Sequence, residues 1–176
     1  MKNQVLVFLI LFLFFSCNEK PQEKQSEEIF TETSQIESKT NKSDSLSLTG
    51  IKEISNDIFD KTWLTYLDIL GQDCCMAGVE CLAIREIPKE IKNLKNLETL
   101  HLTLNYIHEL PIEILELKKL KVLNLTDNPG FSDIQTVGKM KWLESFSCYG
   151  CYLSKEEIKY LKKELPNCEI NANYSK

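Results

Sequence analysis

The feature that most constrains this chain is a regular 23-residue spacing of leucines in its C-terminal half. Leu97, Leu120 and Leu143 follow one another at this interval, and Cys74 stands one interval earlier. Four repeats therefore occupy residues 74–96, 97–119, 120–142 and 143–165. No unit of this size can bury its own apolar face, so such units stack on one another. The repeats are expected to share one continuous core.

Within a repeat, apolar residues first alternate and then take a helical spacing. Leu100 and Leu102 show the alternation, which predicts a short strand with one buried face. Ile114 and Leu117 follow at a spacing that predicts a helical turn on the opposite side. The same two strand positions hold Ala77, Val79, Leu123, Leu125, Phe146 and Cys148 in the other repeats. The ninth position holds Leu82, Asn105, Asn128 and Cys151. Its asparagines are expected to bond backbone groups that the turn leaves unpaired.

This pattern, L-x-x-L-x-L-x-x-N/C-x-L, resembles the leucine-rich repeat signature over about residues 74–170. LETLHLTLNYIHELPIEILEL at 97–117 matches the 23-residue type at almost every position, whereas in the third repeat Ile134 falls one position late. The resemblance implies an α/β solenoid, with parallel strands on its concave side and short helices or turns on its convex side. It also implies that the concave face binds other proteins.

The ends of such a stack need covers, and two segments are predicted to supply them. Residues 49–73 have apolar side chains at a helical spacing, from Ile51 to Leu70, and are predicted to form an N-terminal capping helix. Residues 74–176 are then the repeat domain with its C-terminal cap. In that cap, SKEEIKYLKKEL at 154–165 predicts a helix, and Leu165, Cys168 and Ile170 predict a last short strand.

Residues 1–16 are predicted to be a signal peptide. Lys2 gives a positive start, and VLVFLILFLFF at 5–15 is an unbroken apolar run. A bilayer-spanning helix needs about 20 such residues, so this run fits a signal peptide instead. FFSC at 14–17 resembles the lipobox of bacterial lipoproteins, which implies lipidation of Cys17 and a membrane anchor made of acyl chains. An ordinary secretory signal with a chance cysteine is the alternative.

Residues 17–48 are predicted to be the lipidated cysteine and a disordered tether. They are rich in Glu, Lys, Ser, Gln and Thr, and too few apolar residues are present to offset the entropy of ordering. Asn18 stands where an aspartate is associated with retention in the inner membrane. By that rule the protein is expected in the bacterial cell envelope, at the outer membrane, facing either the periplasm or the outside.

The concave face carries the candidate binding residues. The strand pattern directs a mildly polar set outward, and its members are His101, Asn124, Ser147, Tyr149, Thr103, Thr126 and Glu80. A protein or peptide partner is the expected ligand. The alternative is an envelope structural or adhesion module that recognises carbohydrate, which exposed aromatic side chains would favour. The net charge of −5, with 21 Lys and Arg against 26 Asp and Glu, does not favour binding to nucleic acid.

Catalysis is not expected, and no cofactor or metal is predicted. The chain has only two histidines, and His101, Asp127 and Ser147 are the one outward-facing trio that could sit together. Nothing in the pattern makes that trio deep or water-excluding, as a catalytic site requires.

Seven cysteines need a separate explanation. With Cys17 lipidated, three lie near the first repeat (Cys74, Cys75 and Cys81) and three near the C-terminal end (Cys148, Cys151 and Cys168). These groups are too far apart to bridge, so at most one disulfide is expected at each end, with at least two free thiols. The motif CYGC at 148–151 suggests a redox or zinc pair. The repeat register instead predicts that both sulfurs point into the core, which disfavours those functions.

Overall fold

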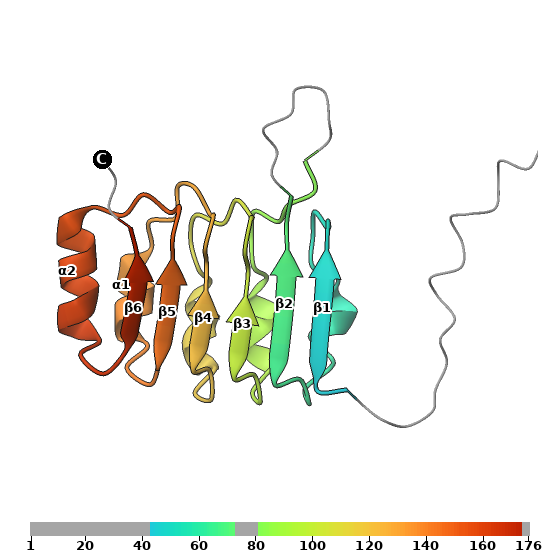
Figure 1. Cartoon of the computed structure of the whole chain (residues 1–176). Helices are drawn as coiled ribbons and strands as arrows, with labels where there is room; N and C mark the ends of the chain where they lie inside the picture. Colours follow the sequence, from blue (N-terminus) through green and yellow to red (C-terminus); the bar gives the residue numbers. More distant parts are fainter. Residues whose placement is uncertain (1–42, 73–80, 174–176) are drawn as a thin grey trace, which may run out of the picture. The chain divides into compact units, whose positions relative to one another are not determined.

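The computed structural model describes residues 43–72 and 81–173, and Figure 1 shows six parallel strands side by side in them. The strands are β1 (Ser45–Thr49), β2 (Tyr66–Leu70), β3 (Thr99–His101), β4 (Val122–Asn124), β5 (Ser145–Cys148) and β6 (Glu169–Ala172). Their order in the sheet is their order in the chain. Each strand therefore adds one rung to a stack, as the α/β solenoid prediction requires.

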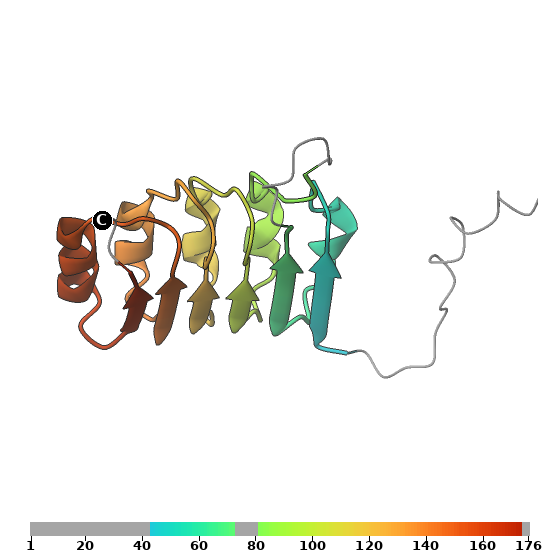
Figure 2. The same cartoon turned by 45° about the horizontal axis from the view of Figure 1, so that its top comes forward.

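Short helices connect the rungs on one side of the sheet (Figure 2). Three are 3-10 helices, η1 (Asn56–Ile58), η2 (Lys89–Asn93) and η3 (Ile112–Glu116), and two are α-helices, α1 (Ile134–Lys139) and α2 (Lys155–Glu164). Pro88 and Pro111 stand immediately before η2 and η3, where a fixed φ and a missing N–H suit a helix start. None of the helices in the described residues is long and apolar enough to cross a bilayer.

The core lies between the strands and the helices. Leu100, Leu123 and Phe146 face one another across β3, β4 and β5 and are almost completely buried. Ile114 and Val137, from the helical side, are fully buried as well. The alternation and the later helical spacing thus correspond to the two walls of one core, which confirms that part of the prediction.

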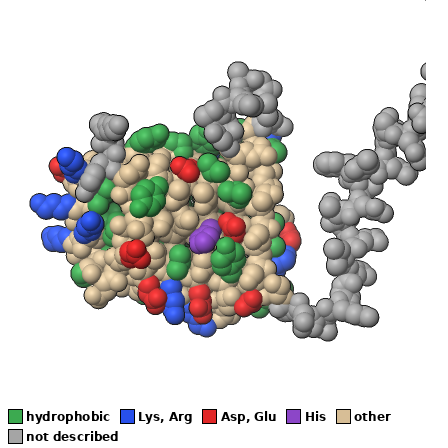
Figure 3. Space-filling model, viewed as in Figure 1, with side chains coloured by type: hydrophobic (Ala, Val, Ile, Leu, Met, Phe, Trp, Pro, Cys, Tyr) green, Lys and Arg blue, Asp and Glu red, His purple; other side chains and the backbone are tan. Residues whose placement is uncertain are grey.

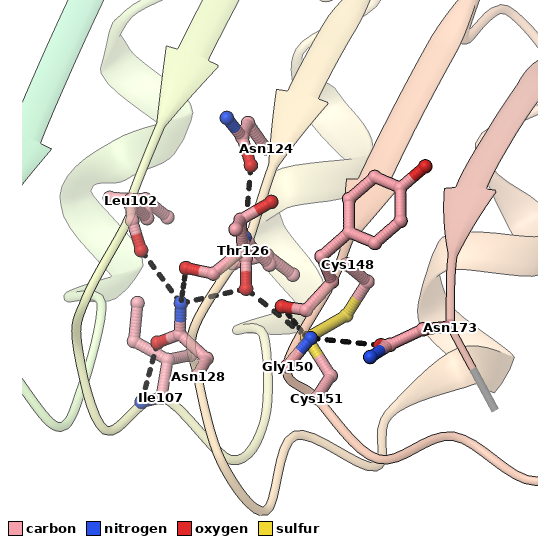
Figure 4. Close-up of a disulfide and its surroundings, with 11 residues drawn as sticks. Leu102, Ile107, Asn124, Thr126, Asn128, Cys148, Gly150, Cys151 and Asn173 are labelled. Carbon is pink, nitrogen blue, oxygen red and sulfur yellow. Dashed lines mark hydrogen bonds between the residues drawn. A yellow bond between two sulfur atoms is a disulfide. The ribbon is translucent and has the colours of Figure 1, made fainter. Parts of the chain in front are cut away.

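The asparagine column forms the predicted ladder between rungs. Asn128 donates from Nδ2 to the carbonyl oxygens of Leu102, at 2.7 Å, and Leu125, at 2.9 Å, and its Oδ1 accepts from the Ile107 N–H at 3.0 Å (Figure 4). Asn105 makes the same kind of contacts one rung earlier. Both side chains are buried, so they satisfy backbone groups that water cannot reach.

The predicted N-terminal capping helix over residues 49–73 is wrong. This segment contains the end of β1, the short η1 turn and the whole of β2. Leu64, Leu67 and Ile69 are buried at the spacing that Leu97, Leu100 and Leu102 repeat 33 residues later. Their packing against the next rung overrides the helical spacing of the surrounding apolar residues.

The predicted tether is also too long, because β1 begins at Ser45 and pairs with β2 along its length. Leu46 and Leu48 pack against the core. The first predicted repeat needs a correction of another kind: the strand beside β3 is β2, not one built around residues 77–79. The interval between these two rungs exceeds 23 residues, and residues 73–80 lie outside the described part of the chain.

Gly71 is required by the close approach of two rungs. A β-carbon at this position would lie within 1.9 Å of the Leu104 carbonyl oxygen and 2.6 Å of the Asn105 Oδ1. Gly71→Ala is therefore expected to lower the free energy of unfolding by about 1–3 kcal/mol. Urea denaturation measures this, with Ser47→Ala at an exposed position as the control. Equal stability of the two variants would contradict the close packing.

The C-terminal cap agrees with the sequence. Ser154 accepts from the Glu157 N–H at 3.2 Å, and the Glu157 carboxylate accepts from the Ser154 N–H at 2.7 Å, so a capping box begins α2. After the helix, β6 pairs with β5 as the predicted last strand. Ile158, Leu161 and Leu165 of this cap cover the end of the core.

Candidate partner-binding face

The side of the sheet opposite the helices is the candidate site, and we call it the outer face. It consists of the strand residues whose side chains alternate with the buried ones. In register, Asp68, His101, Asn124 and Ser147 form one row across β2 to β5. The structure therefore brings three of the predicted binding residues, His101, Asn124 and Ser147, into a single line.

A second row lies just beyond the ends of the strands. Thr103, Thr126 and Tyr149 follow at the repeat interval, and the Tyr149 side chain is 49% exposed. Leu70, at the end of β2, is 37% exposed. Asn124 Oδ1 accepts from the Thr126 N–H at 2.9 Å, which holds the amide of Asn124 in place between the two rows. This second row thus adds hydroxyl groups and the exposed ring of Tyr149 to the first row.

Two residues of this face, Tyr66 and Asp68, were not predicted. They belong to β2, which was assigned to the capping helix. Tyr66 and His101 pack edge to face, with ring centroids 5.4 Å apart, and Tyr66 Oη lies 3.2 Å from His101 Nδ1. The signal that could have found them is the sequence LTYLDI at 64–69, which follows L-x-x-L-x-L.

Other predicted site residues fall outside the described part of the chain. Glu80 lies in the segment 73–80, and the lipidation site Cys17 lies before residue 43. The structure therefore places neither of them relative to the outer face. The signal peptide and most of the tether also precede residue 43.

The turns after the strands form a rim along the outer face. Leu104 and Asp127 both have φ of 57°, a left-handed conformation, and Gly150 occupies the equivalent position with φ of 71°. A β-carbon on Gly150 would lie 2.4 Å from Asp127 Oδ1, so glycine leaves room for that carboxylate. These residues line a groove of about 260 Å³ together with Tyr106 and Tyr152. Backbone in sparsely populated conformations is found often at functional sites.

The catalytic trio is not assembled. His101 and Ser147 are separated by β4, and two strand spacings amount to about 9.6 Å, far beyond a hydrogen bond. No cluster of His, Cys, Asp or Glu suited to a metal ion occurs within residues 43–72 and 81–173.

Cys148 and Cys151 are buried, as the repeat register predicts, and they form a disulfide (Figure 4). Tyr149 and Gly150 lie between them. Cys81 is also disulfide-bonded, and Cys168 is free. The bridge at the C-terminal end agrees with the predicted limit of one bridge per end; the full number of free thiols stays a prediction, because Cys74 and Cys75 lie outside the described residues.

The bridge replaces one step of the asparagine ladder. The Cys151 sulfur lies 3.2 Å from the Leu125 carbonyl oxygen. This is the position that corresponds, one rung later, to the contact between the Asn128 amide and the Leu102 carbonyl oxygen. A sulfur in a disulfide has no proton to donate. This rung is therefore held by the covalent bond and by the Asn173 Oδ1, which accepts from the Gly150 N–H at 2.9 Å.

Removing this bridge is expected to destabilise the domain. Closure of so short a loop restricts the unfolded chain by about 2 kcal/mol. Cys148→Ala with Cys151→Ala should lower the free energy of unfolding by at least about this amount, since buried sulfur is lost as well. Urea denaturation checks it, with Cys168→Ala as the matched control. A double variant as stable as the unsubstituted protein would refute the role of the bridge.

The free thiol of Cys168 is expected to react slowly. Burial raises the pKa of this thiol to about 11, so its thiolate is on the order of 100-fold scarcer near pH 8 than in an unfolded chain. Alkylation by iodoacetamide, followed at Cys168 by mass spectrometry, should be slow in the folded protein and fast in urea. Cys168 stabilises the fold below about pH 8.5, and this contribution disappears as the pH rises toward 11. Equal alkylation rates would contradict this.

Comparison with known proteins agrees with this geometry. A family model described as a leucine-rich repeat region matches residues 75–169. A leucine-rich repeat protein of Leptospira interrogans superposes with a TM-score of 0.50 at 23% identity, over 70% of this chain and 36% of that one. An internalin of Listeria monocytogenes gives 0.44 at 19% identity, over 73% and 42%. A search of curated proteins found no match.

The chain thus spans less than half the length of these two solved proteins, and the likeness to the Leptospira protein concerns the fold alone. The six-rung sheet, the asparagine ladder and the matching family model lead to one assignment. The chain belongs to the leucine-rich repeat family, whose members are typically non-enzymatic scaffolds that bind other proteins.

Proposed function

We propose that this protein is an exported, lipid-anchored leucine-rich repeat protein that binds a protein or peptide partner through its outer face. The observation that supports the binding site is the row of His101, Asn124 and Ser147, which the register brings together across three neighbouring strands. These side chains are half-buried, so they are held by their neighbours while their polar ends meet solvent. A surface of this kind binds by complementarity, with no covalent step.

The binding proposal is tested by replacing the outer face without disturbing the core. His101→Ala, Asn124→Ala and Tyr149→Ala are combined, and circular dichroism establishes that the variant folds. Lys139→Ala with Glu156→Ala, on the helical side, is the matched control. In cross-linking pull-downs from intact cells, a partner captured by the unsubstituted protein and the control should be lost with the triple variant. Unchanged capture by the triple variant would refute the site.

The anchor rests on the resemblance of FFSC at 14–17 to a lipobox. Cells expressing the full chain and fed a labelled fatty acid should incorporate the label into the protein, and Cys17→Ala should abolish it. Processing should also be blocked by globomycin. Outer-membrane location is then read from fractionation of the membranes, and protease treatment of whole cells distinguishes an outward from a periplasmic orientation. A protein that is secreted without label would contradict the anchor.

Carbohydrate recognition is the second candidate, and one observation favours it. Tyr152 is 65% exposed and lines the rim groove with Asp127 and Gln72, and it follows the exposed Tyr149 by three residues in the chain. Exposed aromatic rings beside amide and carboxylate groups are suited to stacking on sugar rings. A glycan array distinguishes the two functions: saccharide binding that is lost in Tyr152→Ala while the protein partner is still captured would assign the groove to sugars.

A further inference from the structure

The outer face and its rims carry an acidic charge that the rest of the fold does not share. The charged side chains on the strands and in the residue before each strand are Asp44, Asp68, Glu98, Lys121, Glu144 and Glu169, and Asp127 lies in the rim. Two cations lie near the rim: Lys52 follows β1, and Arg85 lies 5.4 Å from the ring centroid of Tyr106. Figure 3 shows this as red side chains on and around the sheet, with the blue ones at its edges. The helices, by contrast, carry many lysines, including several in α2.

Three lysines that precede β3, β4 and β5 in the chain are each paired with a carboxylate. Lys121 Nζ lies 3.7 Å from the Glu144 carboxylate. On the lower edge of the helical side, Lys95 pairs with Glu116 at 2.6 Å and Lys141 pairs with Glu164 at 2.7 Å. No ion pair in residues 43–72 or 81–173 neutralises Asp68, Glu98 or Asp127. These three carboxylates therefore give the face a negative electrostatic potential, which is complementary to a positively charged partner.

Asp68 has surroundings that suit a cationic side chain in particular. It lies directly across from His101 in the β2–β3 register, and Tyr66 precedes it on the same face of β2. The Tyr66 and His101 rings hold each other in a fixed edge-to-face arrangement. A carboxylate beside a fixed aromatic ring combines ion pairing with a cation–π contact, which a lysine or arginine side chain can use together.

We propose that the partner segment that lies on the outer face is an extended, cationic peptide rich in lysine or arginine. This inference rests on the proposed function and specifies the chemistry of its ligand. Six strands about 4.8 Å apart span about 24 Å, so a strand-like segment of about eight residues crosses the face. Asp68 and Asp127 contact its charged side chains at separate places along that path.

The inference is tested with a labelled peptide of about ten residues in which lysine and threonine alternate, long enough to cross the sheet. Its matched counterpart has glutamate in place of lysine. Fluorescence polarisation is measured on the full mature chain at about 20 mM and about 300 mM salt, which changes screening between surface charges. Asp68→Asn with Asp127→Asn removes two charges from the face; Asp60→Asn with Glu156→Gln removes two elsewhere and is the control.

The lysine peptide should bind the unsubstituted protein and the control alike, and about tenfold more weakly to the Asp68→Asn, Asp127→Asn variant. Salt should weaken the binding, and the glutamate peptide should not bind. Failure of the lysine peptide to bind, equal losses in the two double variants, or binding of the glutamate peptide would overturn the inference. A further outcome separates this inference from the proposed function: the triple alanine variant loses the natural partner in pull-downs, while salt and Asp68→Asn with Asp127→Asn have no effect on its capture. In that case the outer face binds the partner, but the partner segment is not cationic.

Discussion

Leu123→Ala is expected to lower the free energy of unfolding by about 2–5 kcal/mol, the usual range for truncating a buried leucine. Leu123 is fully buried in β4 and lies between Leu100 and Phe146 of the neighbouring strands. In a stack whose stability is a sum of rungs and interfaces, a cavity in a central rung weakens the interfaces on both of its sides. The total free energy of unfolding of a small domain is only a few times larger than this loss.

The measurement is urea denaturation followed by circular dichroism. Val122→Ala is the matched control, because Val122 is the preceding residue of the same strand and its side chain points to the outer face. It should cost less than about 1 kcal/mol, as partly exposed positions usually do. If the two variants lose the same stability, β4 does not have the buried and outward sides that the structure assigns to it.

Asn128→Ala is the second large effect, and its cause is polar rather than apolar. The substitution leaves the Ile107 N–H and the Leu102 carbonyl oxygen without partners in a buried turn. An unpaired buried group costs about 1–3 kcal/mol, so the two groups together are expected to cost about 2–6 kcal/mol. The residue also fastens one rung to the one before it, and its removal should therefore speed hydrogen exchange at the Ile107 amide.

Asn93→Ala, at an exposed position in η2, is the control for this experiment. This substitution removes the same type of side chain at a position where water can form its hydrogen bonds. It should change the free energy of unfolding by less than about 0.5 kcal/mol. Hydrogen exchange measured by mass spectrometry on both variants locates the effect. If the Ile107 amide in Asn128→Ala stays as protected from hydrogen exchange as in the unsubstituted protein, the asparagine ladder does not stabilise this turn.

The outer face and the ladder are linked through the CYGC segment. The motif first suggested reactive sulfur, yet both cysteines are buried and bonded to each other, and Tyr149 between them stands on the binding face. The disulfide therefore restrains the chain on both sides of the exposed ring, next to β5. Neither sulfur is exposed, and the bridge joins the residues on either side of Tyr149 and Gly150 in the chain.

Periodicity was sufficient to predict the fold wherever the repeat interval is constant. From residue 97 onward an apolar residue at each buried strand position meets another apolar residue of the next rung, so periodicity alone places Leu100, Leu123 and Phe146 in the core. For the same reason His101, Asn124 and Ser147 could be placed on one face before any strand was observed. Successive side chains of a strand point to opposite faces of the sheet, so the sequence of a strand is enough to tell which residues share a face.

The N-terminal rungs could not be predicted from periodicity, because their interval differs from that of the repeats. Tyr66 and Asp68 lie 33 residues before Thr99 and His101, a longer interval than the repeat allows, while nearby apolar residues also fit a helix. Local spacing cannot choose between those alternatives; burial of Leu67 and Ile69 against β3 does, because a strand there extends the existing core and its hydrogen bonds. The bridge between Cys148 and Cys151 was decided in the same way, since a disulfide depends on where two side chains meet in space rather than on their separation in the chain.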